Sequence, residues 1–234
     1  MLSRAVGAAI VILTMAGCRS GCRSESEPEI APEGPAGARR RAPRNTCGAA
    51  PGRLCPGETL EARVLSIARD YAHWGKLDVE PRWAPMPCAP PWAPVLGDMY
   101  FSDEQVNEGA HGRKLYYLYA FDPEDYTRYQ PPKVVPPGQV IVKDAFLPIA
   151  VPGVPVRDEL PPAHARWNDE VYRAGDPVGL FVMAKLDPGT DGTDEGWVYG
   201  VVTPGAAKVT AGKLEPCMSC HRGAPRDRLF GFHR

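Results

Sequence analysis

The sequence predicts an α+β domain that begins with a helix and continues mostly as β-strands. Residues 57–74 place apolar side chains at spacings of three and four, the period of an amphipathic helix. Four later segments are rich in β-branched and aromatic residues and are bounded by turn-forming residues, as strands are: 114–121, 139–146, 180–186 and 197–202. A chain of 234 residues is long enough for one such domain with a sizeable core.

The first 18 residues have the pattern of an export signal. A short basic start precedes an almost wholly apolar run over residues 5–15, which is too short to span a bilayer as a lasting helix. The ending Met15-Ala16-Gly17-Cys18 resembles a bacterial lipoprotein box, in which the cysteine is lipidated. The alternative is an ordinary cleaved signal with Cys18 incidental. We expect a periplasmic or cell-surface protein, held at the membrane by a lipid anchor rather than by a spanning helix.

Residues 19–46 are mostly Ser, Glu, Pro, Gly and Arg, which predicts a disordered linker before a domain over residues 47–234. The net charge of −1 gives no reason to expect a nucleic-acid partner. In an oxidising compartment we expect one disulfide among Cys47, Cys55 and Cys88. The sequence leaves open whether Cys55 pairs with Cys47 or with Cys88.

The elements follow in a consistent order. The helix over residues 57–74 ends before a glycine, which is a common helix stop. Residues 83–94 are rich in Pro and Trp and are predicted to be irregular. After the strand over 114–121, Pro123 sits at the first position of a short helix that runs to about residue 129.

The last two predicted strands form a hairpin. A polar loop rich in Asp and Gly, over residues 187–196, joins the strand over 180–186 to the strand over 197–202. Side chains alternate between the two faces of a strand, so Phe181 and Met183 share a face of the strand over 180–186. In the same way, Lys143 and Ile141 share a face of the strand over 139–146.

The strongest functional signal is Cys217-Met218-Ser219-Cys220-His221. Cys-x-x-Cys-His is the attachment motif of a c-type haem. Two thiols three positions apart lie on one side of a helical turn and can form thioethers with the two vinyl groups of one porphyrin. The next residue, His221, then offers its imidazole to the iron.

Three other interpretations of this motif remain open, of which a structural disulfide across the two-residue gap is uncommon. A structural zinc site normally takes four ligands, often from two cysteine pairs, whereas this chain has one Cys-x-x-Cys. A thioredoxin-like redox pair would begin a helix in a βαβ unit, whereas this pair follows sequence broken by Gly and Pro. The motif therefore favours haem c, with Cys217 and Cys220 as attachment residues and His221 as the iron ligand.

From about residue 115 to 232, the chain resembles the cytochrome P-460 family, which includes the cytochromes c′-beta. Four pieces carry the resemblance in order: Tyr119 to Tyr126, Pro137 to Asp144, Gly196 to Gly200, and Cys217 to Phe230. The resemblance implies a mainly antiparallel sheet with a few helices, one haem c near the C-terminus, and often a homodimer.

The resemblance also implies roles for two further residues. Lys143 matches the strand lysine that can bond covalently to the porphyrin edge in P-460 members; the alternative is a lysine with its head in solvent. Phe181 falls where hydroxylamine-oxidising members place a carboxylate over the open iron face, which implies an apolar distal pocket instead.

Two functions are left open. In one, an open iron site acts on small nitrogen compounds, by oxidation of hydroxylamine with electrons passed to a redox partner cytochrome, or by handling nitric oxide. In the other, the protein is a non-catalytic gas-binding or electron-transfer cytochrome of the c′-beta type. The oxidase needs an acid or base above the iron and a Lys143–haem link, whereas the binder needs neither.

Overall fold

The structure is a computed structural model that describes residues 52–84, 113–128, 134–155 and 160–230. Residues Asn45–Arg234 form one compact unit. The predicted export signal with Cys18, the predicted linker over 19–46, and the cysteines Cys47 and Cys88 lie outside the described residues. Within the described ranges, no helix combines the length and apolar composition needed to cross a membrane.

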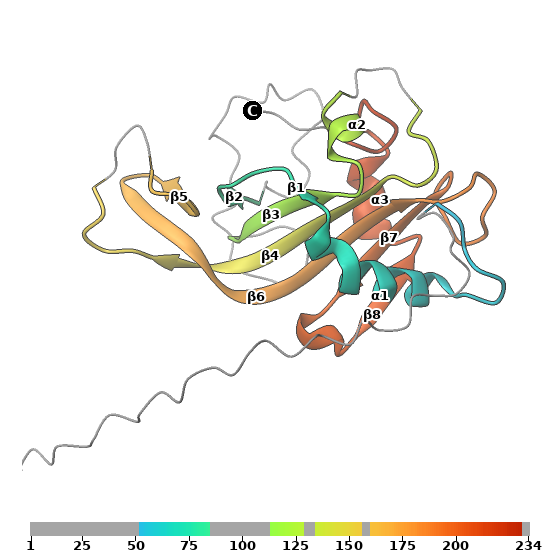
Figure 1. The fold of residues 1–234 in the computed structure, drawn as a ribbon, viewed down its shortest axis with the longest axis horizontal. Coiled ribbons are helices and arrows are strands. Elements are labelled where there is room, and N and C mark those ends of the chain that lie inside the picture. The colour runs from blue at the N-terminus through green and yellow to red at the C-terminus, as the bar shows by residue number, and fades with distance from the viewer. Residues whose placement is uncertain (1–51, 85–112, 129–133, 156–159, 231–234) are drawn as a thin grey trace, which may run out of the picture. The chain divides into compact units, whose positions relative to one another are not determined.

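The described strands form one eight-stranded sheet with a few short helices (Figure 1). The path through the sheet is β1-β3-β4-β6-β7-β8, with β2 also beside β3 and β5 beside β6, and the paired strands are antiparallel. This confirms the predicted α+β class with a mainly antiparallel sheet. The elements are α1 (Leu60–Asp70), η1 (Tyr71–His73), β1 (Gly75–Lys76), β2 (Arg82–Trp83), β3 (Leu115–Ala120), α2 (Pro123–Arg128), β4 (Val140–Ala150), β5 (His164–Trp167), β6 (Glu170–Lys185), β7 (Trp197–Val202), η2 (Pro204–Ala206), β8 (Val209–Gly212) and α3 (Glu215–His221).

Helix α1 covers one face of the sheet. It starts later than the sequence pattern suggests because the side chain of Thr59 caps it, accepting a hydrogen bond from the Ala62 amide at 3.1 Å. Its buried Val64 packs into the core cluster on this face. Gly200 on β7 allows the close approach, because a Cβ added there would lie 2.6 Å from Cγ1 of Val64.

The register of the strands determines on which face of the sheet each of the other side chains lies. Val142 on β4 pairs with Val182 on β6, and both belong to the core under α1. Lys143 pairs with Phe181 one position along, so these two side chains share the opposite face. Helix α3 packs on that opposite face through Met218, which is 3 % exposed. The two helices therefore lie on different faces of one sheet (Figure 1).

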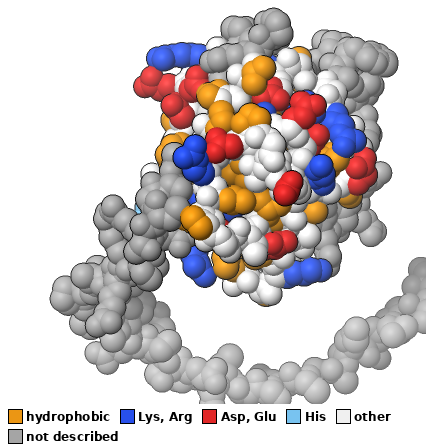
Figure 2. All heavy atoms as spheres, turned by 90° about the vertical axis from the view of Figure 1, so that its right-hand side faces the viewer, with side chains coloured by type: hydrophobic (Ala, Val, Ile, Leu, Met, Phe, Trp, Pro, Cys, Tyr) orange, Lys and Arg blue, Asp and Glu red, His pale blue; other side chains and the backbone are white. Residues whose placement is uncertain are grey.

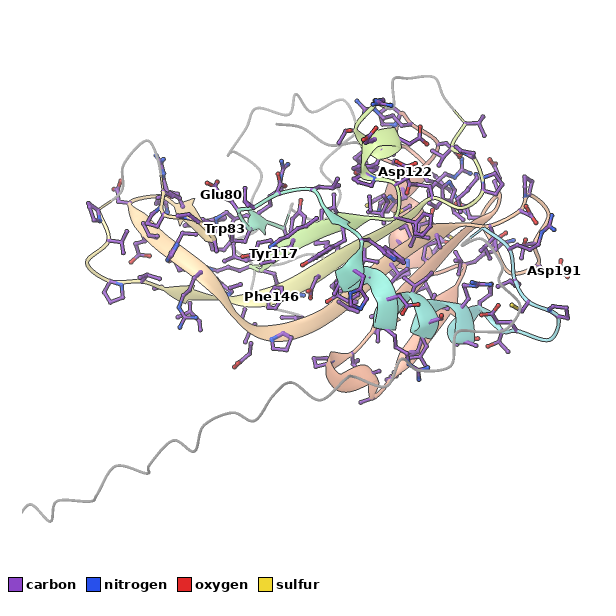
Figure 3. All side chains as sticks on the ribbon, viewed as in Figure 1. Glu80, Trp83, Tyr117, Asp122, Phe146 and Asp191 are labelled. Carbon is purple, nitrogen blue, oxygen red and sulfur yellow. The ribbon has the colours of Figure 1, made fainter. Side chains whose placement is uncertain are left out.

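The sheet extends further than the sequence patterns indicate. Strands β4 and β6 continue past the predicted segments, with register irregularities near Phe146. Beyond that point β6 pairs with β5, which was not predicted. Tyr117 and Phe146 lie side by side on β3 and β4, with ring centroids 5.9 Å apart (Figure 3). Trp83, expected in an irregular segment, belongs instead to β2.

The surface carries no single-sign field on the side that Figure 2 shows. Acidic and basic side chains are interspersed there, with apolar side chains between them (Figure 2). This mixture agrees with the near-zero net charge of −1.

Candidate functional site

The Cys-x-x-Cys-His motif forms most of the short helix α3, which spans Glu215–His221. A proline near its first position favours helix initiation there. Because an α-helix turns once every 3.6 residues, Cys217, Cys220 and His221 project from one side of it. The predicted helical setting of the two thiols is therefore confirmed.

Helix α3 is held to the sheet by its apolar side. Met218 packs in a buried cluster with Ile141, Tyr199 and Leu229. Cys217 packs against the edge of the same cluster and is half-buried. Burial, and then the neighbouring Cys220, raise the pKa of the Cys217 thiol. Both cysteines are thiols rather than members of a disulfide.

His221 has a defined tautomer. Its Nδ1 lies 2.7 Å from the backbone carbonyl oxygen of Arg228, and a carbonyl only accepts, so Nδ1 carries the proton. The lone pair of Nε2 is then available to a metal, as in metal-binding histidines whose other nitrogen donates to a carbonyl. Burial, together with the positive charge of Lys143, lowers the pKa of His221 although the carbonyl hydrogen bond opposes the shift. The neutral imidazole is the form that binds iron.

The ring of His221 lies against two aromatic side chains. The centroid of the Phe230 ring is 5.2 Å away, and that of the Tyr199 ring is 5.8 Å away. Tyr199 is 1 % exposed and Phe230 is 38 % exposed. These contacts restrict rotation of the imidazole, so the lone pair keeps one direction.

Lys143 and Phe181 lie together on the same face of the sheet as α3. The Nζ atom of Lys143 is 5.9 Å from the Phe181 ring centroid and 4.6 Å from that of Tyr116. Burial, and then the positive charge of Lys114, lower the pKa of Lys143 to about 7. The effect of Lys143 on the pKa of His221 indicates that the two side chains interact electrostatically. The sequence-predicted residues are thus brought to one face.

Lys114 also lies at this face, although no sequence motif marked it as a candidate site residue. It is buried, its Nζ lies 5.9 Å from the Phe181 ring centroid, and burial lowers its pKa to about 8. Strand alternation places Lys114 on the same face as Tyr116, so the pattern was available in the sequence. Lys185, by contrast, is paired with another residue, because its ammonium donates a hydrogen bond to the Asp227 carboxylate at 2.9 Å.

The predicted disulfide falls only partly within the described residues. Cys55 is disulfide-bonded. Its partner is not Cys217 or Cys220, because both of these are thiols. The choice between Cys47 and Cys88 stays open, since both lie outside the described residues.

A hollow of about 390 Å³ lies on the other face of the sheet. Its lining includes Ala68 on α1, Leu180 on β6 and the pair Tyr71–Asp144, in which the Tyr71 hydroxyl donates to Asp144 at 2.8 Å. The motif on α3 does not line it. This hollow is therefore separate from the candidate site.

The residues at α3 fit a c-type haem. Two thiols and an imidazole with a free Nε2 lone pair on one side of a helix are the donor set that haem c requires. In the ranges that the structure describes, no group of three or more His, Cys, Asp and Glu side chains is placed to hold a metal ion. A porphyrin brings most of the ligands of its own iron, so the chain would need to add a histidine rather than a complete metal cluster.

Comparison with known proteins does not assign the chain to a family. No family model matches the sequence, and no curated protein matches it significantly. The resemblance to the cytochrome P-460 family therefore stays a prediction.

Proposed function

We propose that this protein is an exported mono-haem c-type protein of the cytochrome P-460 type, anchored by lipid at Cys18. Cys217 and Cys220 would form the thioethers and the imidazole of His221 would bind the iron. Each thioether would form when the S–H group of a cysteine adds across a vinyl double bond. The sulfur atom becomes bonded to one vinyl carbon and the hydrogen atom to the other, so the addition needs no oxidant or reductant. The observation that carries the proposal is the Nδ1 hydrogen bond of His221 to Arg228, beside two reduced thiols.

The sheet face beside α3 supplies the surroundings of the site. Haem c, when bound, supplies an iron that binds small ligands and exchanges single electrons with a partner. Phe181 and Tyr116, whose rings lie near the Nζ atom of Lys143, would offer aromatic surface to a bound haem and its small ligand. Lys143 offers an amine whose lowered pKa of about 7 leaves part of it unprotonated at neutral pH. This combination suits a small nitrogen compound such as nitric oxide or hydroxylamine.

The two side chains favour different chemistry. Lys143 favours oxidation in either of two forms. As an unprotonated amine it would accept a proton from hydroxylamine, and bonded to the porphyrin edge it would alter the haem instead. Loss of two protons and two electrons converts hydroxylamine to nitroxyl. An amine at Lys143 would accept one proton and water the other, and two molecules of an oxidised cytochrome would accept the electrons. Phe181 favours binding without turnover, because it carries no acid or base. We propose an open ligand-binding face in either case, with Lys143 deciding whether oxidation occurs.

Ligand binding and turnover can be measured on the exported protein. Lys143→Met is compared with Lys76→Met, since Lys76 lies on the α1 face, where its Nζ sits 3.3 Å from the Tyr117 ring centroid. An oxidase should reduce added cytochrome when given hydroxylamine, and Lys143→Met should lower this rate about 100-fold, the size of a lost general base. A binder should form a nitric oxide complex with no turnover. Absence of both would contradict the proposed open face.

A further inference from the structure

The turn that follows α3 has an unusual backbone. Asp227 has a φ of 48° and Arg228 a φ of 71°, and the Leu229 amide donates to the Arg226 carbonyl at 3.0 Å. Positive φ at both central residues is the pattern of a type I′ turn, which normally uses Asn or Gly. An arginine in this conformation is uncommon and persists only where its surroundings hold it.

The side chain of Arg228 is held by the β6–β7 loop. Its Nε lies 3.2 Å from Oδ2 of Asp194 and its Nη2 lies 3.3 Å from Oδ1, a bidentate pair. The side chains are 16 % and 9 % exposed, so the pair is largely shielded from water. Burial alone would raise the pKa of Asp194, but Arg228 and Arg222 outweigh it and hold that pKa below its usual range. The carboxylate is therefore ionised.

Asp194 itself has a fixed place. Its backbone exchanges both hydrogen bonds with Trp197, at 2.8 and 2.9 Å, which closes the base of the loop. The hydroxyl of Tyr199 donates to the Asp194 carboxylate at 3.3 Å. The acceptor for Arg228 is thus anchored to β7, the strand against which α3 packs.

These contacts converge on the proposed iron ligand. The carbonyl that accepts from Nδ1 of His221 belongs to Arg228, the residue whose guanidinium Asp194 holds. We infer that Asp194 is a positioning residue for His221, acting through Arg228 to fix the carbonyl that orients the imidazole. The inference rests on the proposed role of His221 as haem ligand.

The physical consequence is electronic as well as geometric. A well-placed acceptor at Nδ1 makes the imidazole a stronger donor to a metal. A stronger donor stabilises oxidised iron, which lowers the reduction potential. Loss of the Asp194 carboxylate should loosen the carbonyl and raise the potential.

The test uses the exported haem-bearing protein and three variants. Asp194→Asn removes the charge at nearly constant size. Arg228→Lys keeps the charge but cannot span both carboxylate oxygens. Asp187→Asn is the matched control on the same loop, where Asp187 forms an exposed pair with Arg53 at 3.0 Å. Midpoint potential, the iron–histidine stretching frequency by resonance Raman, and thermal unfolding are measured on each.

We expect Asp194→Asn to raise the potential and lower the stretching frequency, Arg228→Lys to shift both less, and Asp187→Asn to change neither. A fall in thermal stability with potential and frequency unchanged would show a merely structural role and overturn the inference. If Asp194→Asn does not fold, Arg228→Lys decides the matter by the same two readouts. Wild-type protein without haem would overturn the proposed function and this inference with it.

Discussion

The buried ion pair beside the candidate site gives the sharpest stability prediction. Nζ of Lys185 lies 2.9 Å from Oδ2 of Asp227, and their side chains are 4 % and 10 % exposed. Lys185→Met would leave the Asp227 carboxylate buried, with the Val135 amide, 2.9 Å away, still donating to it. Removing one partner of a buried pair costs about 3–5 kcal/mol, because the other charge is left uncompensated. For a domain of this size the melting temperature should fall by roughly 6–20 °C.

A double variant separates this cause from simple loss of packing. Asn at position 227 can still accept from the Val135 amide and tolerates a φ of 48°. Lys185→Met with Asp227→Asn should therefore be about 2 kcal/mol more stable than Lys185→Met alone in urea unfolding, since no buried charge is left unpaired. Glu124→Gln is the control, because its pair with Arg128 is 75 % and 74 % exposed and should contribute less than about 0.5 kcal/mol. A cost below about 1 kcal/mol for Lys185→Met would show that the Asp227 carboxylate is not left uncompensated in the folded protein.

Three further outcomes are expected. Gly200→Ala should cost about 1–3 kcal/mol in denaturant unfolding, because its Cβ would lie 2.6 Å from Val64, and adding Val64→Ala should recover part of that loss. Thr59→Ala should cost about 1 kcal/mol by removing the cap on the Ala62 amide, and an unchanged unfolding midpoint would count against this cap. Lys143 has a folded pKa of about 7 against an ordinary value of 10.5, so the unfolded chain binds more protons between these values and stability should rise with pH in that window. Unfolding at pH 7 and pH 10 should show a smaller rise in Lys143→Met than in the wild type, and equal rises would contradict the shift.

Much of the fold followed from local patterns. Short-range alternation and turn residues predicted two strands, over 114–121 and 197–202. The same signals predicted the hairpin in which the second of these strands pairs with the strand before it. The short helix beginning at Pro123 was predicted from its start signal. The two-residue strands β1 and β2 were not predicted, because only their pairing with β3 defines them and two residues are too few to show an alternating pattern.

The candidate site divides in the same way. Cys217, Cys220 and His221 were found because the motif is contiguous in sequence. The hydrogen-bond acceptor for His221 was not predicted, because it is a backbone carbonyl, that of Arg228, which every residue type has. Its position depends on a turn with positive φ, which no local motif indicated. The Asp194–Arg228 pair spans 34 residues, and such contacts follow from tertiary packing rather than from local sequence.

Intact mass of the exported protein, made with a cytochrome c maturation system, shows whether the chain carries a covalently attached haem. We expect one haem added to each chain, and this haem should resist acid-acetone extraction. No haem should be covalently attached when Cys217 and Cys220 are both changed to Ser. The matched variant Ser219→Ala, exposed on the same helix, should retain the haem mass. A colourless wild-type protein whose mass equals that of the bare polypeptide would contradict haem attachment at Cys217 and Cys220.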